Sequence, residues 1–466
     1  MENELWRASA KQIADGIREK TFTCREVVDS CLDRIADANH ALRALSHIRP
    51  EDARAQADRA DAALAAGEAL GPLHGVPVVI KGNVDVADWP TVNGCNELVN
   101  NIAATHSPCV ENWLSSGAIV IGRTNTPEFC CRWETSNEVF GQTANPWNAE
   151  VTPGGSSGGT ASAIAAGLAP LGHGTDLGGS LRHPAQCCGI ASLKPTLGRV
   201  PDWVPSLEEP SIGFQLMNTD GPMARRVEDL ELGLRSMACA AGGDPWWVPA
   251  EFTGQQSLSK PIAVVFNPNR SGASEHVRKG VEKAVEILSK TGFGVEEALP
   301  PRLDDAVKIW KEVCVYELLN GLRPAVEGFC GDRLKRALAH YSKVDAQLSP
   351  EAYQMALTER TAVLREWMSF FDRYGAIVAP VSTLPPQSID FDINSVESTL
   401  TLMESMNMVV PINALGLPAV VVPVGVEDGL PQAVQIIGAP FEEMRCLNIA
   451  SRIEAAVDQI TPVEPS

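Results

Sequence analysis

The chain has 466 residues, of which 44% are hydrophobic and 21% charged, and these proportions exclude disordered, collagen-like and coiled-coil proteins. At about 150 residues per domain, this length allows two or three domains or one large one. The 58 acidic and 38 basic side chains give a formal net charge of −20. Because no local basic stripe offsets this charge, we expect neither a nucleic acid nor a membrane as a partner.

The N-terminal segment and the cysteines indicate the cellular compartment. Residues 1–10 include Glu2, Glu4 and Arg7 and no apolar run, so they predict neither a signal peptide nor a transit peptide. The twelve cysteines include no Cys-x-x-Cys pair of the kind that binds zinc. Reduced thiols are typical of a large chain without a secretion signal. We therefore expect a cytoplasmic protein.

The first seventy residues are predicted to be helical. Ile13, Ile17, Cys31 and Ile35 recur at helical intervals, and a run rich in Ala, Arg and Asp follows. We expect residues 1–70 to form an N-terminal helical arm that docks on the rest of the molecule.

From residue 76 onward, short β-branched runs alternate with helical patterns. Strands are predicted at 76–80, 118–121, 262–266, 376–379 and 419–423, and helices at 111–116, 160–169, 275–291, 351–372 and 442–456. This alternation predicts an α/β fold with a central mixed, largely parallel β-sheet flanked by helices. Because strands occur near both ends of the chain, we expect a single large domain over 1–466, with 240–400 as a partly helical insertion.

A glycine- and serine-rich stretch, residues 152–160, is open to three interpretations from its residues alone. Gly154, Gly159 and Thr160 imitate part of a phosphate-binding loop, but the lysine of that motif is missing. A Gly-x-Ser-x-Gly elbow around Ser156 would need a preceding strand and a later histidine, and the last histidine is His340. The third interpretation is a flexible loop without chemistry.

The stretch continues into a second block, and together the two resemble the long motif of the amidase signature family. The matching residues are Gly154-Gly-Ser-Ser-Gly-Gly159 and Asp176-x-Gly178-x-Ser180-Leu-Arg182-x-Pro184-Ala185. Supporting blocks lie at 71–81, 121–129, 193–199, 219–226 and 413–423. The segment 240–400 matches weakly, as expected of a variable region on the substrate side.

The resemblance implies a hydrolase with a Ser-Ser-Lys triad and without a metal or organic cofactor. Ser180 then corresponds to the nucleophile, Ser156 to the bridging serine and Lys81 to the base. A serine hydroxyl is a weak nucleophile, so a base must take its proton as it attacks. Lys81 can do this only as a neutral amine, which requires burial to lower its pKa. The apolar run 76–80 offers such a setting.

Further residues are expected to support this triad. Four backbone N–H groups are expected to form the oxyanion hole, those of Leu177, Gly178, Gly179 and Ser180. Thr175 is expected to support the polar network, and Asp176 and Arg182 are interpreted as a structural ion pair. The family also implies a cis peptide between Gly155 and Ser156.

Substrate identity is less directly encoded. Phe129, Cys131, Trp133 and Gly155 are expected to bind the substrate, and further candidates for the pocket wall are Cys130, residues 203–214, Trp310, Tyr316 and Leu319. Their apolar character favours an aryl or hydrophobic amide, or a carbamate. The same side chains could equally belong to the core.

Some positions depart from the family's pattern. Gly82 stands where many relatives carry an acidic residue, which leaves the polar partner of the lysine open. His74 and His183 are interpreted as packing or hydrogen-bonding residues and not as acids or bases.

The sequence predicts an amidohydrolase that forms an acyl-enzyme on Ser180 with a small amide substrate. Two alternatives remain at this point: the glutaminase subunit of a transfer-RNA-dependent amidotransferase, and a non-catalytic relative that only binds amides. A homodimer formed through the N-terminal helices is a further hypothesis.

Overall fold

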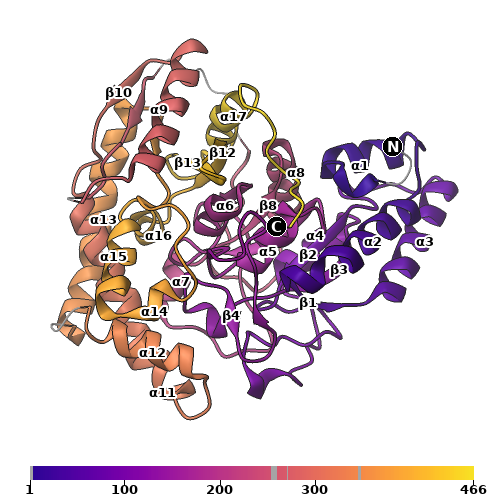
Figure 1. Cartoon of the computed structure of the whole chain (residues 1–466), viewed down its shortest axis with the longest axis horizontal. Coiled ribbons are helices and arrows are strands. Elements are labelled where there is room, and N and C mark those ends of the chain that lie inside the picture. The colour runs from indigo at the N-terminus through magenta and orange to yellow at the C-terminus, as the bar shows by residue number, and fades with distance from the viewer. Residues whose placement is uncertain (1–3, 253–259, 270, 345–347, 466) are drawn as a thin grey trace.

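An eleven-stranded sheet runs through the middle of the computed structural model, which describes residues 4–252, 260–269, 271–344 and 348–465 (Figure 1). In spatial order its strands are β1 (Leu45–Ile48), β3 (Ile119–Thr124), β2 (Pro77–Lys81), β6 (Leu171–Thr175), β8 (Asp220–Ala224), β7 (Ala191–Lys194), β12 (Ala419–Glu427), β13 (Leu430–Ile437), β11 (Ala376–Ala379), β9 (Ile262–Val264) and β10 (Val295–Glu297). Two short strands, β4 (Ser136–Asn137) and β5 (Gly141–Gln142), pair separately.

The sheet is mixed, as predicted. Parallel pairing occurs in two blocks, β3-β2-β6 and β11-β9-β10. Between these blocks, from β6 to β11, every pair is antiparallel. One of these pairs is the hairpin of β12 and β13, which turns at Asp428 and Gly429, both with positive φ, in keeping with the Asp-Gly preference of tight hairpins. The description "largely parallel" therefore fits the two blocks and not the middle of the sheet.

Helices cover the sheet on both faces (Figure 1). They are α1 (Ala10–Arg18), α2 (Cys24–Leu42), α3 (Pro50–Ala66), α4 (Pro108–Ser115), α5 (Gly158–Ala165), α6 (Arg182–Cys188), α7 (Ile212–Met217), α8 (Val227–Met237), α9 (Glu275–Lys290), α10 (Leu303–Trp310), α11 (Arg323–Val326), α12 (Asp332–Tyr341), α13 (Pro350–Arg373), α14 (Phe391–Asn394), α15 (Val396–Ser405), α16 (Val410–Leu415) and α17 (Glu443–Glu454). Two π-helical stretches, Lys311–Val315 and Leu318–Leu322, connect α10 with α11.

Strand β6 shows how the two helical layers meet the sheet. A Cβ at Gly172 would lie 2.5 Å from a methyl group of Thr160 in α5, so that helix packs directly on the backbone. The next residue, His173, points to the other face, where its ring lies edge-on to Trp113 of α4. Because successive side chains of a strand face opposite ways, one short strand contacts both layers. The small residue at 172 allows the close approach of α5.

The five predicted strands and the five predicted helices all occur, with ends shifted by a few residues. The prediction omitted β1, β4, β5, β6, β7, β8, β10 and β13. Strand β6 carries two glycines in five residues, and glycine is depleted in strands, so its local sequence gives little strand signal. Pairing with β2 and β8 in the assembled sheet fixes its conformation.

The predicted N-terminal arm, 1–70, and the predicted insertion, 240–400, both contribute strands to the central sheet. Within residues 1–70, helices α1, α2 and α3 are interrupted by β1, which pairs with β3 at the sheet edge. The segment 240–400 supplies β9, β10 and β11 as well as a run of helices that lies on the far side from α1 to α3 (Figure 1). Residues 1–3, 253–259, 270, 345–347 and 466 lie outside the described residues.

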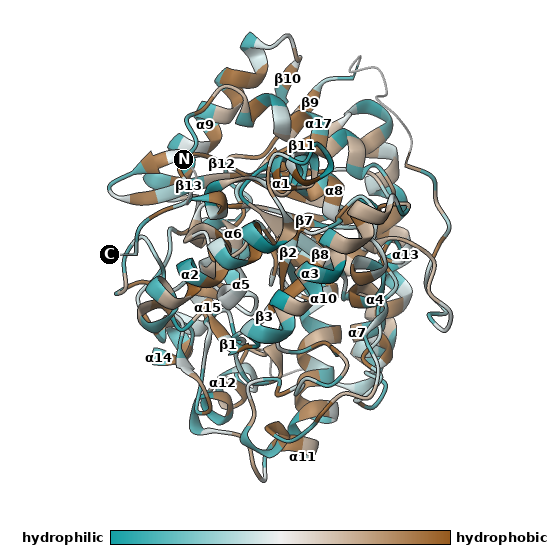
Figure 2. Ribbon diagram, turned by 90° about the vertical axis from the view of Figure 1, so that its right-hand side faces the viewer, coloured by the Kyte–Doolittle hydropathy of each residue, from teal (hydrophilic) through white to brown (hydrophobic). Residues whose placement is uncertain are grey.

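Hydropathy follows this layering. The outer helices such as α3 and α9 carry both hydrophilic and hydrophobic positions (Figure 2), and the apolar side of α9 is buried through Val277, Val281 and Leu288. Strands β2 and β11 are buried at every position. Among the described residues, no helix combines the length and apolar character needed to cross a bilayer.

Candidate active site

The site is built where two parallel strands end side by side. Lys81 is the last residue of β2 and Thr175 the last of β6, and these strands pair in parallel through Val78 and Val79. The carboxyl ends of neighbouring parallel strands meet at one edge of a sheet. Lys81 Nζ accordingly hydrogen bonds with Thr175 Oγ1 at 2.8 Å, and it makes a second hydrogen bond, of 2.7 Å, with Ser156 Oγ.

Lys81 is fully buried, and this burial lowers the pKa of its amine. The shift arises because an ammonium ion loses its hydration inside the protein. The Cys130 thiol and the carboxylates of Asp176 and Asp220 act on the pKa of Lys81 in the opposite direction but do not reverse it. The buried amine therefore loses its proton more readily than the amine of an exposed lysine.

The position of Gly82 directly after this lysine has a steric reason. A Cβ there would lie 2.9 Å from the carbonyl oxygen of Thr124 in β3, so an acidic side chain would require the backbone to move. The next residue, Asn83, places its amide nitrogen 3.5 Å from Thr175 Oγ1. Asn83 thus supplies a polar contact to the hydroxyl that binds Lys81.

Ser156 lies on the loop that leads into α5. The peptide between Gly155 and Ser156 is cis, as the family resemblance implies. Hydrogen bonds from Thr135 Oγ1 to the carbonyl of Gly154 and from Thr126 Oγ1 to the carbonyl of Ser156 hold the loop, at 2.8 and 3.1 Å. The structure therefore presents Ser156 from a tightly held backbone.

Gly155 packs against backbone and does not line the cavity. A Cβ at this position would lie 2.5 Å from the carbonyl oxygen of Arg132 and 2.6 Å from the nitrogen of Glu134. The residues around the cavity include its neighbour Ser156 but not Gly155 itself. The glycine is needed for this close packing, and its expected role in substrate binding stays a prediction.

Ser180 lies on a loop wrapped around the carboxylate of Asp176. The N–H of Gly179 donates to Asp176 Oδ1 at 2.7 Å, and the N–H of Leu181 donates to Oδ2 at 3.2 Å. Of the four N–H groups expected in the oxyanion hole, that of Gly179 is therefore already engaged. The N–H groups of Leu177, Gly178 and Ser180 have no acceptor among the described residues, and the same three residues line the cavity.

Asp176 is itself held by a buried ion pair with Arg182. Arg182 Nε lies 3.0 Å from Asp176 Oδ2, and neither side chain is exposed. Burial by itself would raise the pKa of Asp176, but the Arg182 guanidinium outweighs it and holds the pKa at about 2. Asn413 adds a hydrogen bond from its Nδ2 to Asp176 Oδ1 at 2.9 Å. The carboxylate is charged at neutral pH and organises the loop that carries Ser180.

A cavity of about 580 Å³ opens beside the three hydroxyls of Ser156, Thr175 and Ser180. Of the residues expected to form its wall, these line it: Phe129, Cys130, Cys131, Trp133, Trp203, Val204, Leu207, Glu208, Glu209, Pro210, Phe214 and Trp310. Tyr316 and Leu319 are not among the lining residues, and Tyr316 packs instead against Tyr353 with ring centroids 4.9 Å apart. The expected wall is therefore largely present.

The sequence interpretation missed several cavity residues, among them Val315, Leu318 and Met403. They come from the connecting π-helical stretches and from α15, and no local pattern marks them as part of a pocket. The two histidines in the motifs contact other groups: His74 Nε2 lies 3.1 Å from the carbonyl oxygen of Ala60, and His183 Nε2 lies 3.4 Å from Cys187 Sγ. Burial lowers the pKa of His183 to about 4. Neither histidine lines the cavity.

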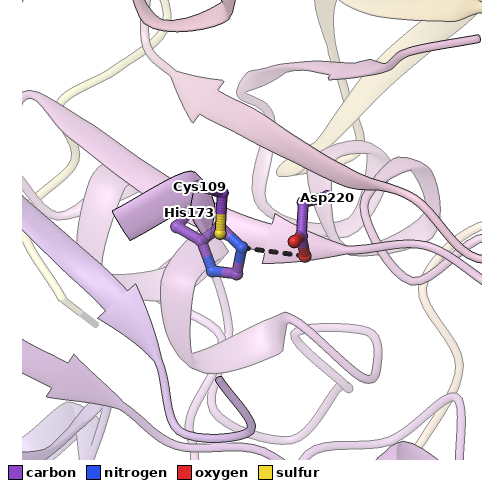
Figure 3. Close-up of side chains that lie close together, drawn as sticks. All are labelled: Cys109, His173 and Asp220. Atoms are coloured by element: carbon purple, nitrogen blue, oxygen red, sulfur yellow. Dashed lines mark hydrogen bonds and ion pairs between the residues drawn. The ribbon is translucent and has the colours of Figure 1, made fainter. Parts of the chain in front are cut away.

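One further cluster contains side chains that could hold a metal ion. Cys109, His173 and Asp220 place one ligand atom each within 4.8 Å of one another, and all three are buried (Figure 3). His173 Nε2 and Asp220 Oδ1 are 3.0 Å apart. None of the three residues lines the cavity, so they do not contact a molecule bound there.

Comparison with known proteins identifies the family. A family model described as Amidase matches residues 26–447. The chain is 36% identical over 454 residues to an indoleacetamide hydrolase of Bradyrhizobium diazoefficiens, a match that covers 97% of this chain and 86% of that protein. It is 31% identical over 486 residues to a glutamyl-tRNA(Gln) amidotransferase subunit of Geobacillus kaustophilus, a match that covers 97% and 98%.

A solved structure supports the same assignment. A bacterial aryl acylamidase of the amidase signature family matches with a TM-score of 0.82 and 25% identity, over 98% of this chain and 96% of that one. The chain therefore belongs to the amidase family, and it is an enzyme that hydrolyses the carbon–nitrogen bonds of amides.

Proposed function

We propose that this amidase hydrolyses a neutral aryl or otherwise hydrophobic amide through an acyl-enzyme on Ser180, with an arylacetamide as the first candidate substrate. Aromatic side chains of the cavity wall, among them Phe129, Trp133 and Trp310, favour an aromatic group. The cavity volume of about 580 Å³ accommodates a molecule of that size. The names of the indoleacetamide hydrolase and the aryl acylamidase support the same substrate class.

In the proposed mechanism, a proton moves from Ser180 to Lys81 through Ser156. The neutral amine of Lys81 accepts the proton of the Ser156 hydroxyl across their 2.7 Å contact, and Thr175 accepts an N–H of the amine. Ser156 simultaneously takes the proton of Ser180, whose oxygen attacks the amide carbonyl. The burial of Lys81 supports this step because it favours the neutral amine, the form that can accept a proton.

The negative charge that develops on the carbonyl oxygen is assigned to the N–H groups of Leu177, Gly178 and Ser180. Donors fixed in place before the reaction stabilise the tetrahedral intermediate without reorganisation. Ser156 then returns its proton to the departing nitrogen as the carbon–nitrogen bond breaks. Water, activated by the same relay, attacks the acyl-enzyme and releases the carboxylic acid.

The observation that carries this proposal is a fully buried lysine hydrogen bonded to two hydroxyls that line a largely apolar cavity. The test is the release of ammonia from indole-3-acetamide and of 4-nitroaniline from 4-nitroacetanilide by the wild-type chain and by Ser180→Ala. We expect turnover by the wild type and a loss of at least about 10³-fold in Ser180→Ala. Ser162→Ala is the matched control, because Ser162 is a buried serine of α5 whose hydroxyl donates to the carbonyl of Ala144.

The same assay separates the alternatives. The two substrates carry the aryl group on the acyl side and on the amine side, so their kcat/KM values identify the side that enters the apolar cavity; an aryl carbamate is the third arm. Activity on glutamine and on neither aryl substrate would favour the glutaminase subunit. This alternative rests on the 31% identity to an amidotransferase subunit. Binding of an amide without any release of amine would favour a non-catalytic relative and contradict the proposal.

Other expectations stay predictions. We propose a homodimer formed through the N-terminal helices, a cytoplasmic location and no nucleic-acid partner; the net charge of −20 supports the last of these. Sedimentation velocity of the full-length chain tests the first, since a monomer at micromolar concentration would contradict it. Fractionation of cells that express the chain tests the second.

A further inference from the structure

Two tryptophan side chains from distant parts of the chain hydrogen bond to the loop that carries the oxyanion donors. Trp133 Nε1 donates to the carbonyl of Gly178 at 2.8 Å, and Trp310 Nε1 donates to the carbonyl of Leu177 at 2.9 Å. Both indoles are buried, and their ring centroids are 6.1 Å apart. The two indoles therefore hydrogen bond to two successive peptide groups of one loop.

The geometry of the peptide bond turns these contacts into an orientation of the loop's N–H groups. In a planar trans peptide, the carbonyl of one residue and the N–H of the next point in opposite directions. When Trp310 fixes the carbonyl of Leu177, it also fixes the direction of the N–H of Gly178, which is one of the three proposed oxyanion donors. The hydrogen bond holds the oxygen on the side of the indole and turns the nitrogen away from it.

The neighbouring peptide is held at both ends. Its carbonyl, on Gly178, accepts from Trp133, and its N–H, on Gly179, donates to Asp176 Oδ1. Glycines adopt a wide range of backbone conformations, so a loop with Gly178 and Gly179 could rotate these peptides at little cost if nothing held them. The indoles and the carboxylate remove that freedom.

Close packing adds to the restraint. A Cβ at Gly178 would lie 2.7 Å from the six-membered ring of Trp310, so the loop backbone rests directly on the indole. Trp310 ends α10, within the segment 240–400 that matches the family motif weakly, whereas Trp133 lies close to the motif in sequence. A side chain from outside the motif thus holds the motif loop through one hydrogen bond and direct packing.

We propose that Trp310 and Trp133 are positioning residues, whose indole N–H groups orient the peptides of residues 177–179 so that the N–H of Gly178 faces the developing oxyanion. This inference rests on the proposed function, because it assigns the oxyanion to that loop. The two tryptophans then have two roles: they line the cavity, and they orient the N–H group that stabilises the transition state.

The test replaces each indole with a ring that lacks the donor. Trp310→Phe is expected to lower kcat at least about tenfold while KM changes less than about threefold, because the lost orientation matters in the transition state and not in the bound substrate. Trp133→Phe is expected to lower kcat by a smaller factor, since Asp176 still holds the other end of that peptide. Trp147→Phe is the matched control, because Trp147 Nε1 donates to the carbonyl of Cys188 and Trp147 does not line the cavity.

Two further measurements separate positioning from a structural role. The affinity for an aryl trifluoromethyl ketone, which forms a tetrahedral adduct with the serine, is expected to fall in parallel with kcat/KM in Trp310→Phe. The pH at which kcat/KM reaches half its plateau is expected to stay unchanged, since Lys81 and Ser156 are untouched. A kcat within about twofold of the wild type in Trp310→Phe, or a loss confined to KM, would overturn the inference.

If Trp310→Phe does not fold, Trp133→Phe decides the matter by the same criteria, with an unchanged kcat overturning the inference. Failure of the proposed function looks different, because Ser180→Ala would then retain activity whatever the tryptophan variants do. Inactive Ser180→Ala together with fully active tryptophan variants would reject the positioning role alone.

Discussion

Asp176→Asn tests how much the stability and the activity of the enzyme depend on one buried carboxylate. Asp176 Oδ1 accepts hydrogen bonds from the N–H of Gly179, from Arg182 Nη2 and from Asn413 Nδ2, and Oδ2 accepts from the N–H of Leu181 and from Arg182 Nε. An amide has one oxygen, so the NH₂ group that replaces the other oxygen would face donors only. The substitution keeps the shape of the side chain and removes its charge and half of its acceptors.

The structure gives two measures of the loss. The pKa of Asp176 is about 2 in the folded chain against an ordinary value of 3.8, which corresponds to about 2–3 kcal/mol of stabilisation of the charged form. Removing one partner of a buried ion pair typically costs about 3–5 kcal/mol, because the other charge is left without compensation. Since Arg182 is fully buried, we expect Asp176→Asn to lose about 3–5 kcal/mol of the free energy of unfolding.

The assay is denaturation by urea, followed by tryptophan fluorescence, with kcat measured on the same samples below the transition. Glu231→Gln is the matched control, because the Glu231–Arg235 pair of 2.9 Å is exposed on α8 and its loss is expected to cost less than about 1 kcal/mol. We also expect kcat to fall, since Gly179 loses its acceptor and the loop around Ser180 loosens.

The pH dependence adds a signed expectation. The folded pKa of Asp176 is depressed, so its stabilisation is fully present above pH 3.8 and is lost as the pH falls through about 2. The difference in stability between the wild type and Asp176→Asn should therefore narrow in that range. A variant that lies within about 1 kcal/mol of the wild type at pH 7 and keeps its kcat would refute the reasoning.

Three further substitutions and one pH profile probe the same region of the molecule. Lys81→Met should abolish amide hydrolysis because it removes the base. It should be at least as stable as the wild type at pH 7, because burial lowers the pKa of Lys81 and disfavours its charged form. Activity above a few percent of the wild type, or a lower melting temperature, would count against this prediction. In the wild type, kcat/KM should rise with pH as this amine loses its proton, with the midpoint below 10.5. Burial raises the pKa of Glu134 to about 8, so wild-type stability should fall as the pH rises from 4.5 to about 8. The melting temperature of Glu134→Gln should depend less on pH over this range. Equal slopes for the two proteins would reject the prediction. Gly178→Ala should lower kcat more than about tenfold with an unchanged circular dichroism spectrum, because its methyl group would meet Trp310; an unaffected kcat would show that the loop yields.

Much of this molecule could be predicted from local sequence. Short β-branched runs indicated the strands β2, β3, β9, β11 and β12, and helical patterns between them indicated five helices. The long motif carried the family resemblance and with it Lys81, Ser156 and Ser180, two of which the structure joins by a hydrogen bond. Strand β6 escaped prediction because its two glycines carry no strand signal of their own.

The amino-acid order alone was enough to establish the type of fold, the positions of the stronger elements and the family to which the motif belongs. The packed molecule was needed to show that Gly179 donates its N–H to Asp176, that Gly155 packs against the backbone of Arg132 and Glu134, and that Trp310 reaches the loop of Gly178 from 132 residues away in sequence. Local patterns record which side chains are buried, because burial depends on the face of one element. They do not record which buried groups meet, because that depends on how distant elements pair and pack.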